Sequence, residues 1–233
     1  MESQSRTELA TVLGDLAIQM QSDVDSASLL RTIVAAAIDI LPGISWGGIA
    51  LVHRRTVTSE APSDAIAKEL DAFQSETGEG PAVTALRDHE SVVVRDLEVE
   101  DRFPRFTERA RELGVRSLVS FRLFVEGETF GALTLYGPNP DLFTEESVAV
   151  GEIFAQHAAV AIASAAAEEQ LQRAVASRDL IGQAKGILMH RDKLTGLQAF
   201  AVLVKASQDT NVKLSEVARV LVSDFEATLP RPS

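Results

Sequence analysis

The chain contains no cysteine, and this absence excludes whole classes of chemistry. There can be no disulfide, no thiolate nucleophile and no thiolate metal site. A reducing compartment is compatible with that composition. The four histidines show no HxxxH or HExxH spacing, and the sequence has neither a GxxxxGK phosphate loop nor a GxSxG elbow. We therefore expect no catalytic residues, no metal site and no bound cofactor. Binding of a small-molecule ligand of unknown identity is still compatible with the sequence.

Long hydrophobic runs are also missing. The longest apolar block, residues 155–167, is rich in alanine and interrupted by Gln156, His157 and Ser164, so it is too short and too weak to span a bilayer. The first twenty residues carry acids within their apolar run and lack a basic start, so they do not read as a signal peptide. We expect a soluble, cytoplasmic protein with no membrane partner.

Positive charge is scarce except in one segment. The chain has 22 Lys and Arg against 34 Asp and Glu, a net charge of −12. Between Arg173 and Arg219, however, eight basic residues face four acidic ones, so this segment is +4 and everything else sums to −16. A polyanion would be repelled by most of the molecule and attracted here. The asymmetry points to nucleic acid as a partner.

The first two thirds of the chain alternate between short strands and helices. Apolar spacing predicts helices at 5–21, 26–41, 63–75 and 103–113, and strands at 46–52, 57–58, 91–94, 117–125 and 129–136. The turn Glu126-Gly127-Glu128 between two β-rich runs indicates a hairpin. Strands mixed with helices around such a hairpin predict an antiparallel α+β sheet.

A single long helix is expected from 144 to 191, with Thr144 and Ser147 at its cap. Eight of the thirteen residues at 155–167 are alanine, which allows close helix contact. One interpretation packs this stretch on its own sheet. The other makes it a dimer seam through Ala158, Ala161 and Ala165 that carries a signal between domains.

Two further helices are expected after the long one. The first covers 197–208, with Phe200, Leu203 and Val204 facing the core, and the second starts after Lys213, with Ser215 as its N-cap. Before them, glycines at 182 and 186 each cost about 1 kcal/mol in helix propensity. Either helices pack closely there, or a partner approaches beside Lys185.

Two family resemblances follow from these residues. The phrases SRDLIGQAKGILM (177–189), AF..L..AS (199–207) and N.KLSEVA (211–218) resemble the ANTAR domain, an RNA-binding module of bacterial antitermination regulators. Residues 24–165 resemble a GAF domain, although Ala82 stands where many relatives have cysteine. The supporting phrases are Gly78-Glu79-Gly80-Pro81, Asp101-Arg102-Phe103-Pro104, Gly114-Val115-Arg116-Ser117 and Phe130-Gly131-Ala132-Leu133.

Together the resemblances imply a fold and a division into domains. A GAF-like antiparallel sheet with flanking helices would be joined by a long helix to an all-α, three-helix ANTAR-like domain. The expected boundaries are an N-terminal helix at 1–23, the GAF-like sensor at 24–165, a helical linker at 166–172 and the ANTAR-like domain at 173–233.

The ANTAR resemblance implies a partner and a site. Its members bind paired RNA hairpins in nascent transcripts, usually as homodimers, and so prevent a terminator from forming. We carry RNA binding onto seven positions: Arg178, Lys185, Arg191, Lys205, Ser207, Asn211 and Lys213. With Phe200 expected to be buried, recognition would depend on loop shape, phosphates and hydrogen bonds.

Other interpretations stay open at this point. Trp46, Arg95, Phe121 and Arg122 are candidates for binding a small molecule in the sensor domain, but the aromatic residues could simply fill the core. The C-terminal helices could recruit a protein partner. Leu214 to Ala218 also resembles the start of a DNA-binding helix-turn-helix.

Overall fold

The computed structural model describes residues 11, 14, 26–53, 56–88 and 91–227. The chain forms two compact units, residues 1–165 and residues 166–233, hereafter unit 1 and unit 2. The helix expected at 5–21 falls almost wholly outside the described residues.

Unit 1 is built on a five-stranded sheet in which every neighbouring pair is antiparallel. The order is β2-β1-β5-β4-β3. The strands are β1 (Trp46–His53), β2 (Thr56–Ser59), β3 (Val92–Val94), β4 (Ser117–Val125) and β5 (Glu128–Gly137). The expected hairpin is present between β4 and β5. Its two loop residues, Glu126 and Gly127, have φ of 50° and 91°, as a tight primed turn requires.

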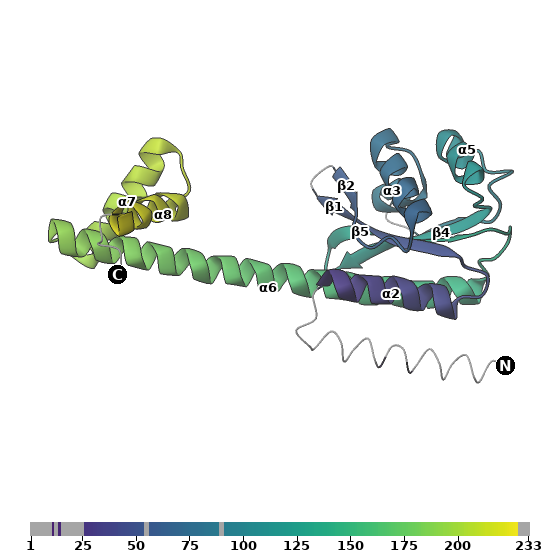
Figure 1. Ribbon diagram of the computed structural model, residues 1–233, viewed down its shortest axis with the longest axis horizontal. Coiled ribbons are helices and arrows are strands. Elements are labelled where there is room, and N and C mark those ends of the chain that lie inside the picture. Colours follow the sequence, from purple (N-terminus) through teal and green to yellow (C-terminus); the bar gives the residue numbers. More distant parts are fainter. Residues whose placement is uncertain (1–10, 12–13, 15–25, 54–55, 89–90, 228–233) are drawn as a thin grey trace. The chain divides into compact units, whose positions relative to one another are not determined.

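Helices cover both faces of this sheet (Figure 1). On one face, α2 (Ser26–Ile40) and the start of α6 (Glu145–Asp192) enclose a core that includes Ile33, Leu133 and Phe154. On the other lie α3 (Ala65–Thr77), α4 (Pro81–Asp88) and α5 (Pro104–Glu112), around Phe106 and Tyr136. The predicted α+β fold of this part is confirmed.

Helix α6 runs without a break through residues 145–192. Its N-terminus is capped as expected, because the Ser147 N–H donates to Thr144 Oγ1 at 3.2 Å. By length and composition it could cross a membrane, but Phe154 and Ala158 lie in the core of unit 1, as expected of a helix that packs on its own sheet.

Part of the alanine-rich stretch of α6 packs in this core. Ala158 is fully buried and Ala161 is 4% exposed, both within the cluster that contains α2 and the sheet. The dimer seam expected through these two alanines is therefore wrong, because their side chains are used inside unit 1. Packing on the domain's own sheet explains the small residues as far as Ala161; Ala165 is only half-buried and lies outside this cluster, so its place in a dimer seam stays a prediction.

Unit 2 contains the end of α6 with α7 (Gly196–Thr210) and α8 (Leu214–Ala227). The three helices bury a small cluster that includes Ala184, Leu188, Ala199, Leu203 and Ala218. A capping box at Thr195 and Gln198 fixes the start of α7. These helices confirm the predicted all-α architecture.

Two expectations within unit 2 are wrong. Phe200 is 41% exposed, because α7 turns Ala199 and Leu203 inward and uses the small alanine for close contact. Ser215 is not the N-cap of α8, since the helix already begins at Leu214. The Lys213 carbonyl accepts from the N–H groups of Glu216 and Val217, so Lys213 holds the capping position.

Candidate nucleic-acid interface and ligand pocket

One face of α6 in unit 2 combines basic residues with glycine. Arg178, Gly182, Lys185 and Met189 follow at intervals of four, three and four residues, which puts them on one side of a helix with 3.6 residues per turn. The buried residues Ala184 and Leu188 lie on another side. We call the four residues together with the adjacent Gly186 the basic stripe.

The two glycines of the basic stripe have open space in front of them. A Cβ built on Gly182 or Gly186 would meet no described atom within 4 Å. Close helix packing within unit 2 therefore does not explain them, and that interpretation is wrong. They leave a bare strip of helix backbone on each side of Lys185, at a cost in helix stability of about 1 kcal/mol each.

Helix α7 begins next to the stripe. A Cβ built on Gly196 would lie 3.6 Å from Lys185 Nζ and 3.7 Å from Met189 Sδ. The half-buried Lys185 thus extends along the first turn of α7. Its ammonium group has no ion-pair partner among the described residues, so it is available to an anion.

Arg191 does not belong to this face. It follows Leu188 by three residues, on the side of α6 that packs in unit 2 rather than the side of Lys185. Its Nε lies 2.8 Å from Asp192 Oδ1. That hydrogen bond lowers the pKa of Asp192. The carboxylate offsets much of the charge that Arg191 would offer to an anion.

The remaining candidates have different local roles. Ser207 Oγ donates to the Val212 carbonyl at 2.6 Å, and Asn211 ends α7 in the left-handed conformation with φ of 54°. Both therefore stabilise the turn between α7 and α8. Lys205 is exposed on the flank of α7 away from Ser207 and Asn211, and the exposed Lys213 immediately precedes α8.

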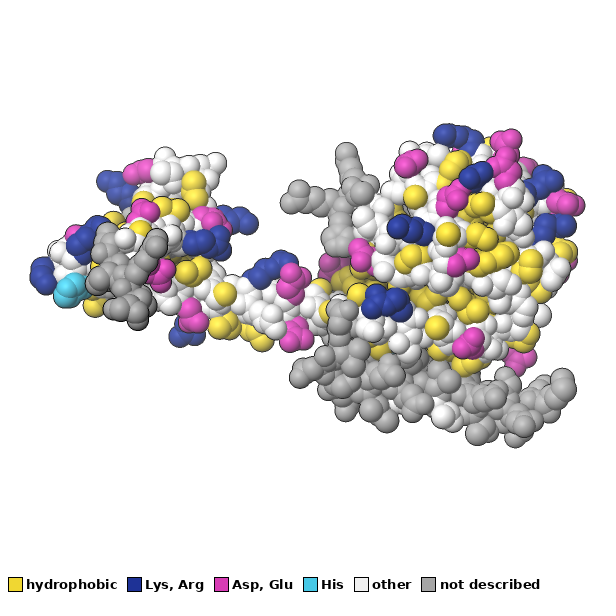
Figure 2. Space-filling view, viewed as in Figure 1, with side chains coloured by type: hydrophobic (Ala, Val, Ile, Leu, Met, Phe, Trp, Pro, Cys, Tyr) yellow, Lys and Arg dark blue, Asp and Glu magenta, His cyan; other side chains and the backbone are white. Residues whose placement is uncertain are grey.

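The charge of the basic segment is only partly neutralised. Of its eight basic residues, three pair with a nearby acid: Arg173 with Glu169, Arg191 with Asp192 and Arg219 with Glu216. The other five form no ion pair within the described part of the chain: Arg178, Lys185, Lys193, Lys205 and Lys213. Basic and hydrophobic side chains lie interspersed on unit 2 in Figure 2, at left.

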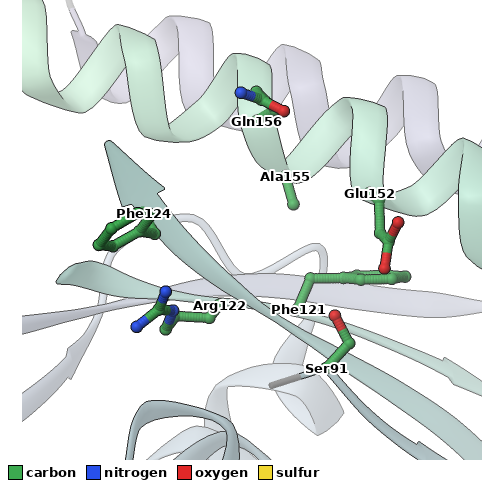
Figure 3. A pocket seen from close by; sticks show the side chains of 7 residues that line it. All are labelled: Ser91, Phe121, Arg122, Phe124, Glu152, Ala155 and Gln156. Carbon is green, nitrogen blue, oxygen red and sulfur yellow. The ribbon is translucent and has the colours of Figure 1, made fainter. Parts of the chain in front are cut away.

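Unit 1 has a shallow pocket of about 290 Å³ between β4 and α6. Figure 3 shows its lining, with Phe121, Arg122 and Phe124 from β4 and Glu152 from α6. The Arg122 guanidinium lies over the Phe124 ring, 4.0 Å from its centroid. Phe121 is 1% exposed, so a small polar molecule in this pocket would contact chiefly the Arg122 guanidinium, the Phe124 ring and the Glu152 carboxylate.

The four ligand candidates do not share this pocket. Phe121 and Arg122 line it, whereas Arg95 lines a second pocket of about 310 Å³ that also includes Glu152. Trp46 is half-buried in the cluster on the opposite face of the sheet. Which pocket a side chain lines depends on the order of the strands and on the helix packed against each face, so it could not be predicted from the sequence.

The buried carboxylate of Asp71 was not predicted from the sequence. Asp71 on α3 is 3% exposed, and Ser59 Oγ donates to its carboxylate at 2.6 Å. Burial raises the pKa of Asp71 to about 6. The fully buried Tyr136 has its pKa raised by burial and by the charge of Asp71. An acid on the apolar side of an amphipathic helix was the only sequence signal.

Family models match two adjacent parts of the chain. The model of the GAF domain matches residues 23–163, and the model of the ANTAR domain matches residues 169–222. No curated protein matches the chain.

Solved structures share the fold of unit 1 at low sequence identity. The GAF domain of a phosphoenolpyruvate-protein phosphotransferase from Coxiella burnetii has a TM-score of 0.54 and 18% identity, covering 70% of this chain and 98% of that one. Free methionine-R-sulfoxide reductase from Neisseria meningitidis has a TM-score of 0.51 and 17% identity, covering 67% and 87%. At these identities the likeness shows the fold alone. A thiol-based reductase is excluded for this chain, which has no cysteine.

Proposed function

The chain belongs to the GAF domain family and continues into an ANTAR domain, and from this premise we propose that it is a cytoplasmic RNA-binding antitermination regulator. The ANTAR domain binds paired hairpins in a nascent transcript and prevents a terminator from forming. The GAF domain senses a small molecule and controls that binding. Both are regulatory domains, and the protein acts by binding rather than by catalysis.

The observation that carries this proposal is the basic stripe. Lys185 is unpaired among the described residues, and the glycines on either side of it have open space in front. An RNA backbone can therefore approach the helix closely and place a phosphate at the ammonium group. The acidic remainder of the chain, at −16, disfavours binding of RNA elsewhere.

The experiment is a selection by the full chain from a library of tandem RNA hairpins with randomised loops. Enrichment of particular loops, with duplex DNA unable to compete, is the expected result. Failure to enrich any RNA at low salt contradicts the proposal. Displacement of the RNA by duplex DNA would support a helix-turn-helix DNA-binding regulator in its place.

A protein-recruiting sensor is the second candidate function. It is favoured by hydrophobic residues exposed on α7, where Leu197 is 81% and Val202 is 45% exposed. Such a partner would remain bound to the full chain at high salt and after nuclease treatment. RNA binding predicts the opposite behaviour, because phosphate contacts weaken steeply as salt increases.

We further propose that the regulator is a homodimer joined along α6. Leu171 and Val175, four residues apart and just before the basic stripe, are 65% and 53% exposed, which is typical of an unpartnered helix face. Leu171→Lys is expected to give a monomer in sedimentation at concentrations where the unmodified protein is dimeric. A sedimentation coefficient unaffected by this change would contradict dimerisation through Leu171 and Val175.

The pocket lined by Phe121, Arg122 and Glu152 is our proposed place for the sensed molecule. Its guanidinium and carboxylate suit a ligand that carries both an anionic and a hydrogen-bonding group. Arg95 lines another pocket and Trp46 packs against the core on the opposite face of the sheet, so we assign the ligand to Phe121 and Arg122 rather than to all four candidates.

A further inference from the structure

Phe200 is a large aromatic residue that unit 2 leaves exposed. It is 41% exposed and lies outside the buried cluster formed by α6, α7 and α8. Its neighbours in sequence, Ala199 and Leu203, supply the packing of α7. The ring is therefore not needed to hold the three helices together.

The position of Phe200 relates it to the basic stripe. It follows Gly196 by four residues, so both lie on the same side of α7. Gly196 is the residue that faces Lys185 Nζ and Met189 Sδ. The Phe200 ring thus stands one helical turn from the point where α7 meets Lys185.

Three properties therefore occur together on one side of unit 2. There is an ammonium group without an ion-pair partner among the described residues, a strip of bare backbone at Gly182 and Gly186, and an exposed flat ring. The ammonium group suits a phosphate, and the bare strip allows a bulky group to come close. A flat ring suits a base, since every base has a π-face that stacks on an aromatic side chain.

We propose that Phe200 stacks on an unpaired base of an RNA loop while Lys185 holds a phosphate of the same loop. The proposal rests on the proposed function and adds the kind of nucleotide that is recognised. Paired bases are stacked within a duplex and cannot reach the ring, whereas loop bases can be splayed out. Phe200 therefore contributes to binding through an unpaired nucleotide rather than through a stem.

The test uses the RNA that the full chain selects from the tandem-hairpin library, and the same RNA with abasic loop nucleotides. Phe200→Leu is expected to weaken binding of the intact RNA by roughly 5- to 150-fold, the worth of one base stacked on an aromatic ring. Phe200→Trp keeps an aromatic face and is expected to retain the affinity. Val202→Ala, an exposed apolar residue on the opposite flank of α7, is the matched control and is expected to change little.

Abasic loops separate stacking from other effects. On the abasic RNA, the unmodified protein and Phe200→Leu are expected to bind equally. Equal binding of the intact RNA by both proteins would overturn the proposal, and so would an equal loss on both RNAs. If no RNA is selected at all, the proposed function fails first. If RNA is selected but Phe200→Leu makes no difference, only the stacking role fails. Thermal unfolding of each variant shows that the fold is kept.

Discussion

Alanine at the two glycines of the basic stripe should make unit 2 more stable and bind RNA less well. Gly182 and Gly186 lie inside α6, where glycine is less favourable than alanine by about 0.8–1.0 kcal/mol. A Cβ at either position would meet no described atom within 4 Å, so no clash offsets the gain. Each substitution is therefore expected to raise the free energy of unfolding by about 1 kcal/mol.

The same methyl groups should obstruct an approaching RNA. They would stand on the bare strip beside Lys185 and hold the RNA backbone away from the ammonium group. We expect Gly182→Ala to weaken affinity for the selected hairpin RNA roughly tenfold, which is about 1.4 kcal/mol. Guanidinium unfolding followed by far-UV circular dichroism measures the first effect. Fluorescence anisotropy with labelled RNA measures the second.

Ala176→Gly is the matched control. Ala176 is exposed on α6, away from the basic stripe, so this change should lower stability by about 1 kcal/mol and leave RNA affinity as it was. Gly182→Ala would then raise stability and lower RNA affinity, whereas Ala176→Gly would lower stability and leave RNA affinity unchanged. If Gly182→Ala and Gly186→Ala are more stable but bind RNA with unchanged affinity, the bare strip is not an RNA surface.

Two other predictions concern unit 1. Gly151→Ala makes the same chemical change in α6, but the added Cβ would overlap the Phe121 ring. This overpacking should lower the free energy of unfolding by about 1–3 kcal/mol, as measured by denaturant titration. Unchanged stability would contradict the packing of Gly151 against Phe121. Burial raises the pKa of Asp71 from 3.8 to about 6, so the folded state holds this proton more tightly, and stability should fall by up to about 3 kcal/mol as pH rises from about 4 to above 6. Asp71→Asn should remove that part of the pH dependence, whereas Asp101→Asn, at an exposed loop position, should not; a profile that Asp71→Asn leaves unchanged would refute this origin.

Local patterns were sufficient to predict the architecture. The β4–β5 hairpin could be predicted because β-branched and apolar residues flank Glu126-Gly127-Glu128. In the structure Glu126 and Gly127 have positive φ, which suits this turn. The start of α6 was readable from Thr144 and Ser147. Such features depend on residues close together in sequence, so no knowledge of the tertiary fold was needed.

The side of a helix that faces its core was harder to predict. Phe200, Leu203 and Val204 have helical spacing, but the small Ala199 decides how closely α7 approaches its neighbours, and Phe200 turns outward as a result. Ala158 and Ala161 likewise looked suited to a dimer, yet they pack within unit 1. Apolar periodicity locates a stripe without saying which partner covers it.

Candidate sites were harder still, because they depend on tertiary neighbours. Lys185 and Gly182 share a face because they lie on one helix, which spacing can show. Arg191 was predicted to bind RNA although helical spacing puts it on the side of Leu188, and the structure pairs it with Asp192. The ligand candidates separated because alternation along the strands sends Trp46 and Phe121 to opposite faces of the sheet.

The most direct test of the central claim is the salt dependence of RNA affinity for the full chain and for Lys185→Glu. Lys68→Glu, an identical change at an exposed position on α3 of unit 1, controls for net charge. The account predicts that affinity falls steeply with salt, and that Lys185→Glu weakens binding and reduces the slope of log affinity against log salt by roughly 1. Lys68→Glu should leave the slope unchanged. Equal slopes and affinities for Lys185→Glu and the unmodified protein would contradict it.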